Sequence, residues 1–183
     1  VVSAPVSATN CPGTSASFSV SATGTGLSYQ WSKGGNVLTG QAGSSLSLNS
    51  VTAADAGVYS VTVSGVCGAS ISHSASLTVN EDVAVVSAPV SVTNCPGTSA
   101  SFSVSATGTG LSYQWYKGGV VLAGETGSSL VLGSVSAADA GTYSVVVSGI
   151  CGNAVTNSAS LTVNDVLVIS VVPMSATNCP GTT

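Results

Sequence analysis

The feature that most constrains this chain is an internal repeat with a period of 84 residues. Cys11 recurs as Cys95 and Cys179, and when residues 2–80 are aligned with 86–164, 17 of the 79 positions differ. A fixed period of this kind is typical of tandem arrays in which each copy is one structural unit. The chain therefore holds two complete copies and the start of a third.

We expect three units with boundaries set by this repeat: residues 1–80, residues 81–165, and the first strand and turn of a third unit at 166–183. The third unit begins as the first does, because Cys179–Thr182 repeats the Cys-Pro-Gly-Thr of Cys11–Thr14. Two interpretations of this last segment stay open. Either the parent polypeptide continues with further repeats, or the spare strand adds to an open sheet edge of a neighbouring subunit.

The composition excludes several classes of function. Only 4% of the 183 residues are charged, against roughly 25% in ordinary soluble domains, and the net charge is -4 with two Lys and no Arg. Such a surface neutralises few phosphates, so we expect no nucleic-acid partner. Acids and bases are too scarce for most catalysis, so we expect no enzyme and no cofactor. No apolar run reaches the roughly 18 to 20 residues of a spanning helix, so we expect no membrane insertion.

Each copy alternates apolar and polar residues in short runs that Gly, Pro and Asn separate. Period-two alternation bounded by such residues is typical of half-buried strands, and no helical periodicity interrupts it. The sequence predicts an all-β fold of tandem antiparallel β-sandwiches with about seven strands each. In the first copy the expected strands lie at residues 2–7, 16–22, 27–33, 37–38, 45–49, 58–63 and 71–79.

Two motifs in each copy carry a resemblance to a known fold. The first copy has Trp31 followed by Asp-Ala-Gly-Val-Tyr at 55–59, and the second has Trp115 followed by Asp-Ala-Gly-Thr-Tyr at 139–143. The pair resembles the immunoglobulin-like fold, with the Trp of strand C in the core and the Tyr of the tyrosine corner on strand F. Close tandem copies resemble the bacterial immunoglobulin-like repeats of large secreted or cell-surface proteins, adhesin stalks among them. The resemblance implies an extracellular or cell-surface location.

The chain also departs from that fold, because valines stand where its intersheet disulfide would be. We expect these valines to fill the core beside the aromatic residues. Asp55 has no Arg to meet, so we expect it to bond backbone amides in the turn before strand F. The expected core residues are Val20, Trp31, Tyr59, Val61, Val104, Trp115, Tyr143 and Val145.

The cysteines lie in turns rather than on core faces. If the immunoglobulin-like topology holds, Cys11 and Cys67 lie at opposite ends of one domain, about 25 Å apart. A disulfide needs Cα atoms about 4.4 to 6.8 Å apart, which excludes that pair. In a linear array the bottom of one domain abuts the top of the next, which predicts a bridge from Cys11 to Cys151. By the same rule Cys67, Cys95 and Cys179 bond copies outside the segment or other chains.

Alternatives for the cysteines and the joints stay open. Free thiols and bridges between laterally packed chains are the two other fates of the cysteines. Their spacing does not suit zinc, and His73 has no His partner, so we expect no metal there. Glu81, Asp82 and Asp165 are candidate calcium ligands at the joints, since hard cations take oxygen ligands. Their alternative role is solubilising charge, because the second joint offers only one carboxylate.

The function that these observations favour is structural. We expect a segment of an extracellular fibre, stalk or filament, stapled by disulfides between consecutive domains, with neighbouring repeats or identical subunits as partners. A second hypothesis is an adhesive or carbohydrate-binding module, with Tyr116 as an extra exposed aromatic and with the variable stretches 36–42 and 69–73 as binding loops or as tolerated drift. A third is a passive spacer in a large secreted enzyme. No glycan or surface ligand can be named.

Overall fold

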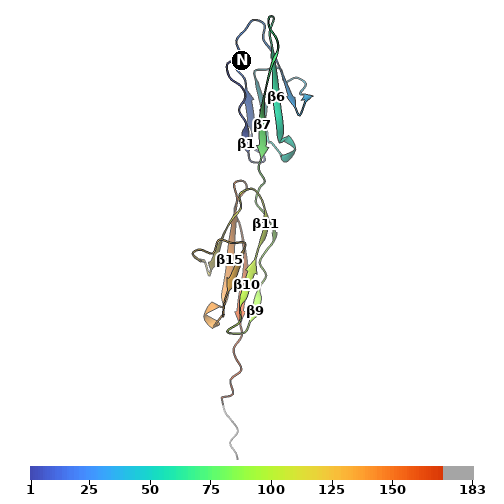
Figure 1. The fold of residues 1–183 in the computed structure, drawn as a ribbon. Helices are drawn as coiled ribbons and strands as arrows, with labels where there is room; N and C mark the ends of the chain where they lie inside the picture. Colours follow the sequence, from blue (N-terminus) through green and yellow to red (C-terminus); the bar gives the residue numbers. More distant parts are fainter. Residues whose placement is uncertain (171–183) are drawn as a thin grey trace, which may run out of the picture.

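The chain forms two β-sandwich units that lie end to end (Figure 1). The structure is a computed structural model that describes residues 1–170. The expected start of a third unit falls largely outside the described residues, Cys179 included, and residues 166–170 form no strand. Within the described part, no helix is long and apolar enough to cross a membrane.

The first repeat consists of seven strands and one 3-10 turn, η1 (Ala53–Asp55). Five strands form one sheet in the order β1-β7-β6-β3-β4, and β2 pairs with β5 in the facing sheet. The strands are β1 (Ala8–Asn10), β2 (Ala16–Ser19), β3 (Ser28–Lys33), β4 (Asn36–Val37), β5 (Ser45–Leu48), β6 (Gly57–Ser64) and β7 (Ile71–Val79).

The second repeat has the same architecture with two further short strands. One sheet has the order β13-β12-β15-β16-β9, while β10 pairs with β14 and β11 with β8. A 3-10 turn, η2 (Ala137–Asp139), precedes β15. The strands are β8 (Ala84–Ser87), β9 (Val92–Asn94), β10 (Ala100–Ser103), β11 (Ser105–Thr107), β12 (Ser112–Lys117), β13 (Val120–Val121), β14 (Ser129–Leu132), β15 (Gly141–Ser148) and β16 (Val155–Val163).

The all-β fold class is confirmed, but the first expected strand is wrong in its bounds. Residues 2–7 contain only an isolated bridge from Ser3 to Ser21. Pro5, which has no N–H to donate, is buried at the point where the chain passes from one sheet to the other. The strand that follows, β1, runs parallel to β7, so the sheet is mixed rather than purely antiparallel.

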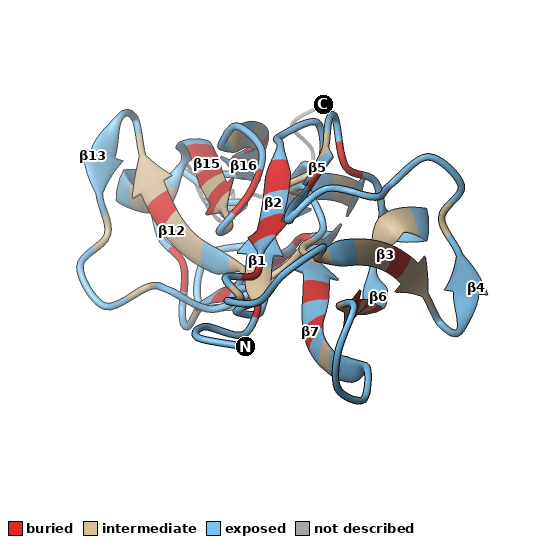
Figure 2. Cartoon of the chain, turned by 90° about the horizontal axis from the view of Figure 1, so that it is seen from above, coloured by how far each residue is buried: buried red, intermediate tan, exposed pale blue. Residues whose placement is uncertain are grey.

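Each repeat has its own core of aromatic and branched side chains. Figure 2 shows buried residues alternating with exposed ones along the strands. The indole Nε1 of Trp31 donates to Gly43 O at 2.9 Å, so this buried ring keeps its hydrogen bond. Phe18 lies between Trp31 and Tyr59. All eight residues expected in the cores are buried: Val20, Trp31, Tyr59, Val61, Val104, Trp115, Tyr143 and Val145.

Candidate functional site: the joint between the repeats

The linker between the repeats is hydrogen-bonded at both of its ends. Asn80 N donates to Asn10 O at 2.9 Å, which ties the start of the linker to the end of β1. One residue later, Glu81 N donates to Thr109 Oγ1 at 2.8 Å, and Thr109 N donates back to Glu81 O at 3.1 Å. The linker therefore leaves the first repeat and meets the turn before β12 of the second without a free residue between.

The next two linker residues lie along the turn between β15 and β16. Asp82 pairs with Cys151 in an isolated parallel bridge, and Val83 N donates to Cys151 O at 3.2 Å. The Val83 side chain is half-buried and packs against the second core. An extended segment fixed by backbone bonds and an apolar side chain has little freedom to swivel.

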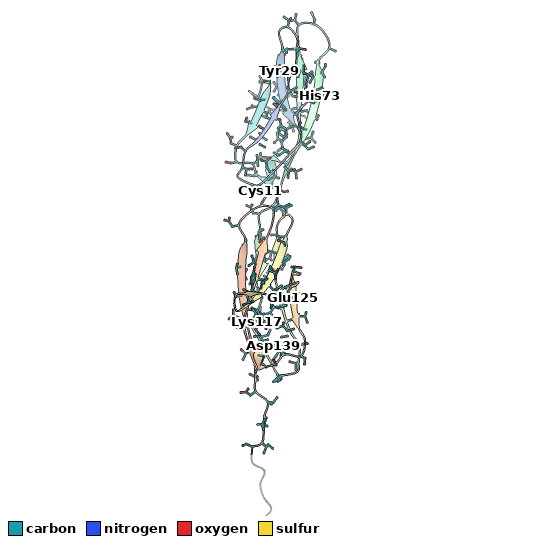
Figure 3. All side chains as sticks on the ribbon, turned by 90° about the vertical axis from the view of Figure 1, so that its left-hand side faces the viewer. Cys11, Tyr29, His73, Lys117, Glu125 and Asp139 are labelled. Atoms are coloured by element: carbon teal, nitrogen blue, oxygen red, sulfur yellow. A yellow bond between two sulfur atoms is a disulfide. The ribbon has the colours of Figure 1, made fainter. Side chains whose placement is uncertain are left out.

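A disulfide crosses this joint. Cys11, in the turn after β1, is bonded to Cys151, in the turn after β15, with a Cα–Cα distance of 5.5 Å. Cys151 is only 2% exposed, and Figure 3 places Cys11 at the boundary between the two repeats. This is the pair that the sequence analysis expects. Among the described residues Cys67 and Cys95 are unpaired and exposed.

Three glycines of the second repeat make room for the linker. A Cβ on Gly149 would lie 2.6 Å from Val83 Cγ2, and one on Gly152 would lie 3.0 Å from Val83 N. On Gly108 it would lie 3.1 Å from Asp82 O. Sequence reasoning missed these residues. Recurrence does not single them out, because every glycine of the first copy recurs in the second.

The first repeat has a cavity at the equivalent place. This cavity of about 420 Å³ lies between the turn before β3 and the turn from β6 to β7, lined by Gly24, Leu27, Val63, Gly65 and Ile71 among others. A Cβ on Gly65 would meet Thr25 O at 3.4 Å and Leu27 Cδ2 at 3.5 Å, which are ordinary contacts. In the second repeat, Val83 of the linker lies at the corresponding place, beside Gly149.

A tyrosine corner closes the other end of each repeat. The Tyr59 hydroxyl donates to Asp55 O at 2.8 Å, and Asp55 Oδ2 accepts from Thr52 N and from Thr52 Oγ1, both at 2.8 Å. The Thr52 N–H, then its hydroxyl, and to a lesser degree Lys33 hold the pKa of Asp55 below its ordinary value. Burial, and next the Asp55 charge, raise the pKa of Tyr59, so its hydroxyl stays a donor.

Both lysines of the chain serve these corners. Lys33 Nζ donates to Ala54 O at 2.5 Å and lies 5.6 Å from the centre of the Tyr59 ring. In the second repeat Lys117 Nζ lies 3.9 Å from Asp139 Oδ1 (Figure 3). Both lysine side chains therefore stabilise turns. Among residues 1–170 the other acidic side chains have no cationic partner.

The remaining candidates of the sequence analysis do not form a chemical site. Within residues 1–170 no three His, Cys, Asp or Glu side chains gather as metal ligands. His73 is half-buried on β7 opposite Val61 of β6. Tyr116 is half-buried rather than exposed, because it lies inside β12 with β13 and β15 on either side. Of the calcium candidates, Glu81 and Asp82 act through their backbone in the joint, and Asp165 is exposed after β16.

Comparisons with known proteins bear on the fold. Residues 2–79 match the PKD-like domain. The structure is similar to the titin I-band fragment I67-I69, with 23% identity and a TM-score of 0.75 over 87% of this chain and 63% of that fragment. It is also similar to Sidekick-1 immunoglobulin domains 1-4, with 21% identity and a TM-score of 0.73 over 90% of this chain and 48% of that one. No curated protein sequence matches the chain.

These likenesses show the fold alone, since the identities are low. The chain is a tandem of immunoglobulin-like β-sandwich domains, and it spans 63% of the length of the titin fragment. A two-domain structure, DIP-gamma IG1+IG2, has 17% identity and a TM-score of 0.64 and is covered over 96% of its length.

Proposed function

We propose that this chain is a load-bearing segment of an extracellular fibre, stalk or filament, in which disulfides staple consecutive immunoglobulin-like repeats. The observation that carries the proposal is the bond from Cys11 of the first repeat to Cys151 of the second. Passive tandem domains need no covalent bond across their joint. The resemblance of the sequence to bacterial repeat arrays supports the same role.

The position of this bond decides how the segment responds to tension. A pull on the two ends of the chain enters the bond at Cys11 and leaves from Cys151, so the 140 positions between them carry no covalent load. Unfolding of either repeat then releases none of that loop. A staple repeated along an array would keep its length fixed even where single domains open.

The hydrogen bonds and packing of the linker resist bending of the joint at forces too low to load the disulfide. Glu81 is hydrogen-bonded to Thr109 through both its N–H and its carbonyl oxygen, and Val83 is bonded to Cys151 and packed against the second core. Bending at the joint would break these contacts together. The joint is therefore stiff before the disulfide is loaded at all.

The chemistry of the joint supports an oxidising location. Disulfides persist outside the cell or at its surface and are rare in reducing compartments. The partners in this proposal are neighbouring repeats or identical subunits, and the role is not enzymatic. Strand faces of Ser, Thr and Val with few charges favour close packing between such subunits.

Single-molecule stretching tests the proposal. The intact chain is pulled from its two ends under oxidising conditions and compared with the Cys11→Ser variant. Full extension of the variant should be longer by about 500 Å, the length of the released loop. The control is Cys95→Ser, which removes a thiol outside this bond. Equal extension of the chain and the Cys11→Ser variant would contradict the proposal.

An adhesive role is the second candidate, because one patch is specific to the second repeat. Tyr116 lies opposite Val121 in β13, and Val120 and Val121 are both exposed. The first repeat has Ser32 and Asn36 at the positions of Tyr116 and Val120. An aromatic ring beside aliphatic groups is a minimal platform for a sugar. Binding on a glycan array that Tyr116→Ser abolishes would favour this candidate, and an array without binding would remove it.

A further inference from the structure

On the side of the first repeat, hydrogen bonds connect Cys11 to the linker. Asn10, which directly precedes Cys11, accepts at its carbonyl oxygen from Asn80 N at 2.9 Å. The Asn10 side chain closes the same turn, because its Nδ2 donates to Thr14 Oγ1 at 3.1 Å and to Ser15 O at 2.9 Å. The position of Cys11 is therefore fixed relative to the start of the linker without help from the disulfide.

On the side of the second repeat, Thr109 connects the linker to the turn that carries Cys151. Its N–H donates to Glu81 O at 3.1 Å, and its hydroxyl oxygen accepts from Glu81 N at 2.8 Å. Its carbonyl oxygen accepts from Ile150 N at 2.9 Å, and Ile150 directly precedes Cys151. Cys11 Sγ lies 3.9 Å from Ile150 O. Thr109 thus contacts both of the segments whose separation decides whether the two sulfur atoms meet.

The residue type at position 109 matters for this connection. The Thr109 carbonyl oxygen accepts from Ile150, and the hydroxyl supplies the acceptor for the Glu81 N–H. A β-branched side chain has few rotamers, which keeps this oxygen in place. Both neighbours of Thr109 are glycines, Gly108 and Gly110, whose φ angles of +142° and +64° other residues rarely adopt. The turn therefore reaches the linker without strain, and a valine at position 109 would keep the shape but lose the acceptor.

The positions of the cysteines show which pairs compete. Among residues 1–170, only Cys11 and Cys151 lie at the facing ends of the two repeats. Cys67 precedes β7 and Cys95 follows β9, which places each of them at the end of its repeat that is remote from the joint. Before oxidation, Cys11 therefore has two kinds of partner, which are Cys151 of its own chain and a cysteine of another chain.

We propose that the Thr109 hydroxyl holds the linker in place before the disulfide forms, and that it thereby directs Cys11 to Cys151 rather than to a cysteine of another chain. The inference rests on the proposed function and names the residue that positions its disulfide. Thr109 acts through the linker and is a positioning residue. An ordered linker raises the effective concentration of each sulfur atom at the other, and this concentration competes with bonding between chains.

The bond forms by thiol–disulfide exchange, with a small-molecule disulfide such as glutathione disulfide as the oxidant. Cys151 is only 2% exposed in the joint, so the thiolate of Cys11 attacks the oxidant first and releases one glutathione thiolate. The thiolate of Cys151 then attacks the Cys11 sulfur of the mixed disulfide and releases the second. The two thiols of the chain lose two electrons and two protons, and the oxidant is reduced to two thiols. The docked linker assists the second step, which needs both cysteines.

Amide hydrogen exchange of the full chain under reducing conditions tests whether the hydroxyl holds the linker. The reporter is the Val83 amide, which donates to Cys151 O at 3.2 Å. Thr109→Val should raise its exchange rate about fivefold, the ratio that corresponds to one hydrogen bond, and Thr109→Ser should keep the original rate. The Ile150 amide, bonded to the Thr109 backbone, should not change. Equal Val83 rates in the Thr109→Val variant and the unaltered chain, or an equal rise at Ile150, overturn the proposal.

Equilibration of the reduced chain with reduced and oxidised glutathione tests the pairing. Thr109→Val should lower the effective concentration of Cys11 for Cys151 by up to about fivefold and raise the share of disulfides between chains, whereas Thr109→Ser should behave as the unaltered chain does. The matched control is Thr25→Val, which changes the equivalent threonine of the first repeat, outside the joint. Peptide mapping without reduction identifies the pairs.

The same map separates this inference from the proposed function. Equal pairing in the unaltered chain and in Thr109→Val overturns the role of Thr109 and leaves the disulfide, and with it the proposed function, standing. Absence of the bond from Cys11 to Cys151 in the oxidised unaltered chain removes both.

Discussion

Gly149 lies so close to Val83 that a Cβ on this glycine would be 2.6 Å from Val83 Cγ2. Gly149 lies in the turn between β15 and β16 and Val83 lies in the linker, and their contact holds the linker against the second core. The Gly149 position has no room for a methyl group unless the linker shifts. Its equivalent in the first repeat, Gly65, has that room.

Gly149→Ala should therefore destabilise the joint while Gly65→Ala does not destabilise the folded chain. We expect a cost of about 1 to 3 kcal/mol for Gly149→Ala, which is typical of overpacking at a filled position. Faster exchange of the Val83 amide hydrogen, which is bonded to Cys151 O, is the measurement. Similar exchange rates in the two alanine variants would show that the linker is not held at Gly149.

Loss of the disulfide should loosen the joint and spare both cores. Cys11→Ser removes a cross-link between positions 140 residues apart, worth about 5 kcal/mol in the chain-entropy treatment of the unfolded state. The cores keep their packing, because neither Cys11 nor Cys151 belongs to them. Distances between spin labels on the two repeats should spread in Cys11→Ser and stay narrow in Cys95→Ser. An equally narrow distribution in both variants would mean that the linker alone sets the geometry.

The tyrosine corners should each contribute one hydrogen bond to the stability of their own repeat. Tyr143→Phe removes the donor to Asp139 O, a bond of 2.8 Å, at an expected cost of about 1 kcal/mol. Tyr59→Phe should cost the same in the first repeat, whereas Tyr116→Phe changes a tyrosine outside the corners. Urea unfolding of the three variants is the measurement. An equal loss in Tyr116→Phe would remove the corner as the cause.

The strands could be predicted from sequence because their pattern is local. Alternation of Ala75, Leu77 and Val79 with polar residues predicts β7, whose bounds are those expected. The first strand could not be placed in this way, since residues 2–7 also alternate. In this stretch the path of the backbone is determined by Pro5 and by the passage from one sheet to the other. The alternation of apolar and polar residues reveals neither of them.

The contacts of the joint could be predicted only in part from the sequence. The pairing of Cys11 with Cys151 follows from topology and from the reach of a disulfide, both of which the sequence constrains once the fold is assumed. The role of Gly149 depends on the position of Val83, which is a tertiary contact between residues far apart in sequence. The exposure expected for Tyr116 was wrong because short β13 flanks it, an effect of neighbours rather than of residue type.

The stability of the folded chain at acid pH should depend on the carboxylates of Asp55 and Asp139 in the two tyrosine corners. The backbone N–H of Thr52, followed by its hydroxyl, lowers the pKa of Asp55, and Ser136 does the same for Asp139. A group whose folded pKa is below its unfolded value binds fewer protons when folded. Its contribution is therefore complete above the unfolded carboxyl pKa of about 4 and is lost as the pH falls through the lowered folded value.

The melting temperature should thus fall as the pH is lowered from about 5 to about 2, and it should fall less steeply in the double variant Asp55→Asn, Asp139→Asn. Thermal unfolding followed by circular dichroism at a series of pH values is the measurement. Glu125→Gln also removes a negative charge but touches neither corner, so it serves as the control for net charge. A double variant with the same slope as the unaltered chain would mean that the lowered carboxyl pKa values do not govern acid stability.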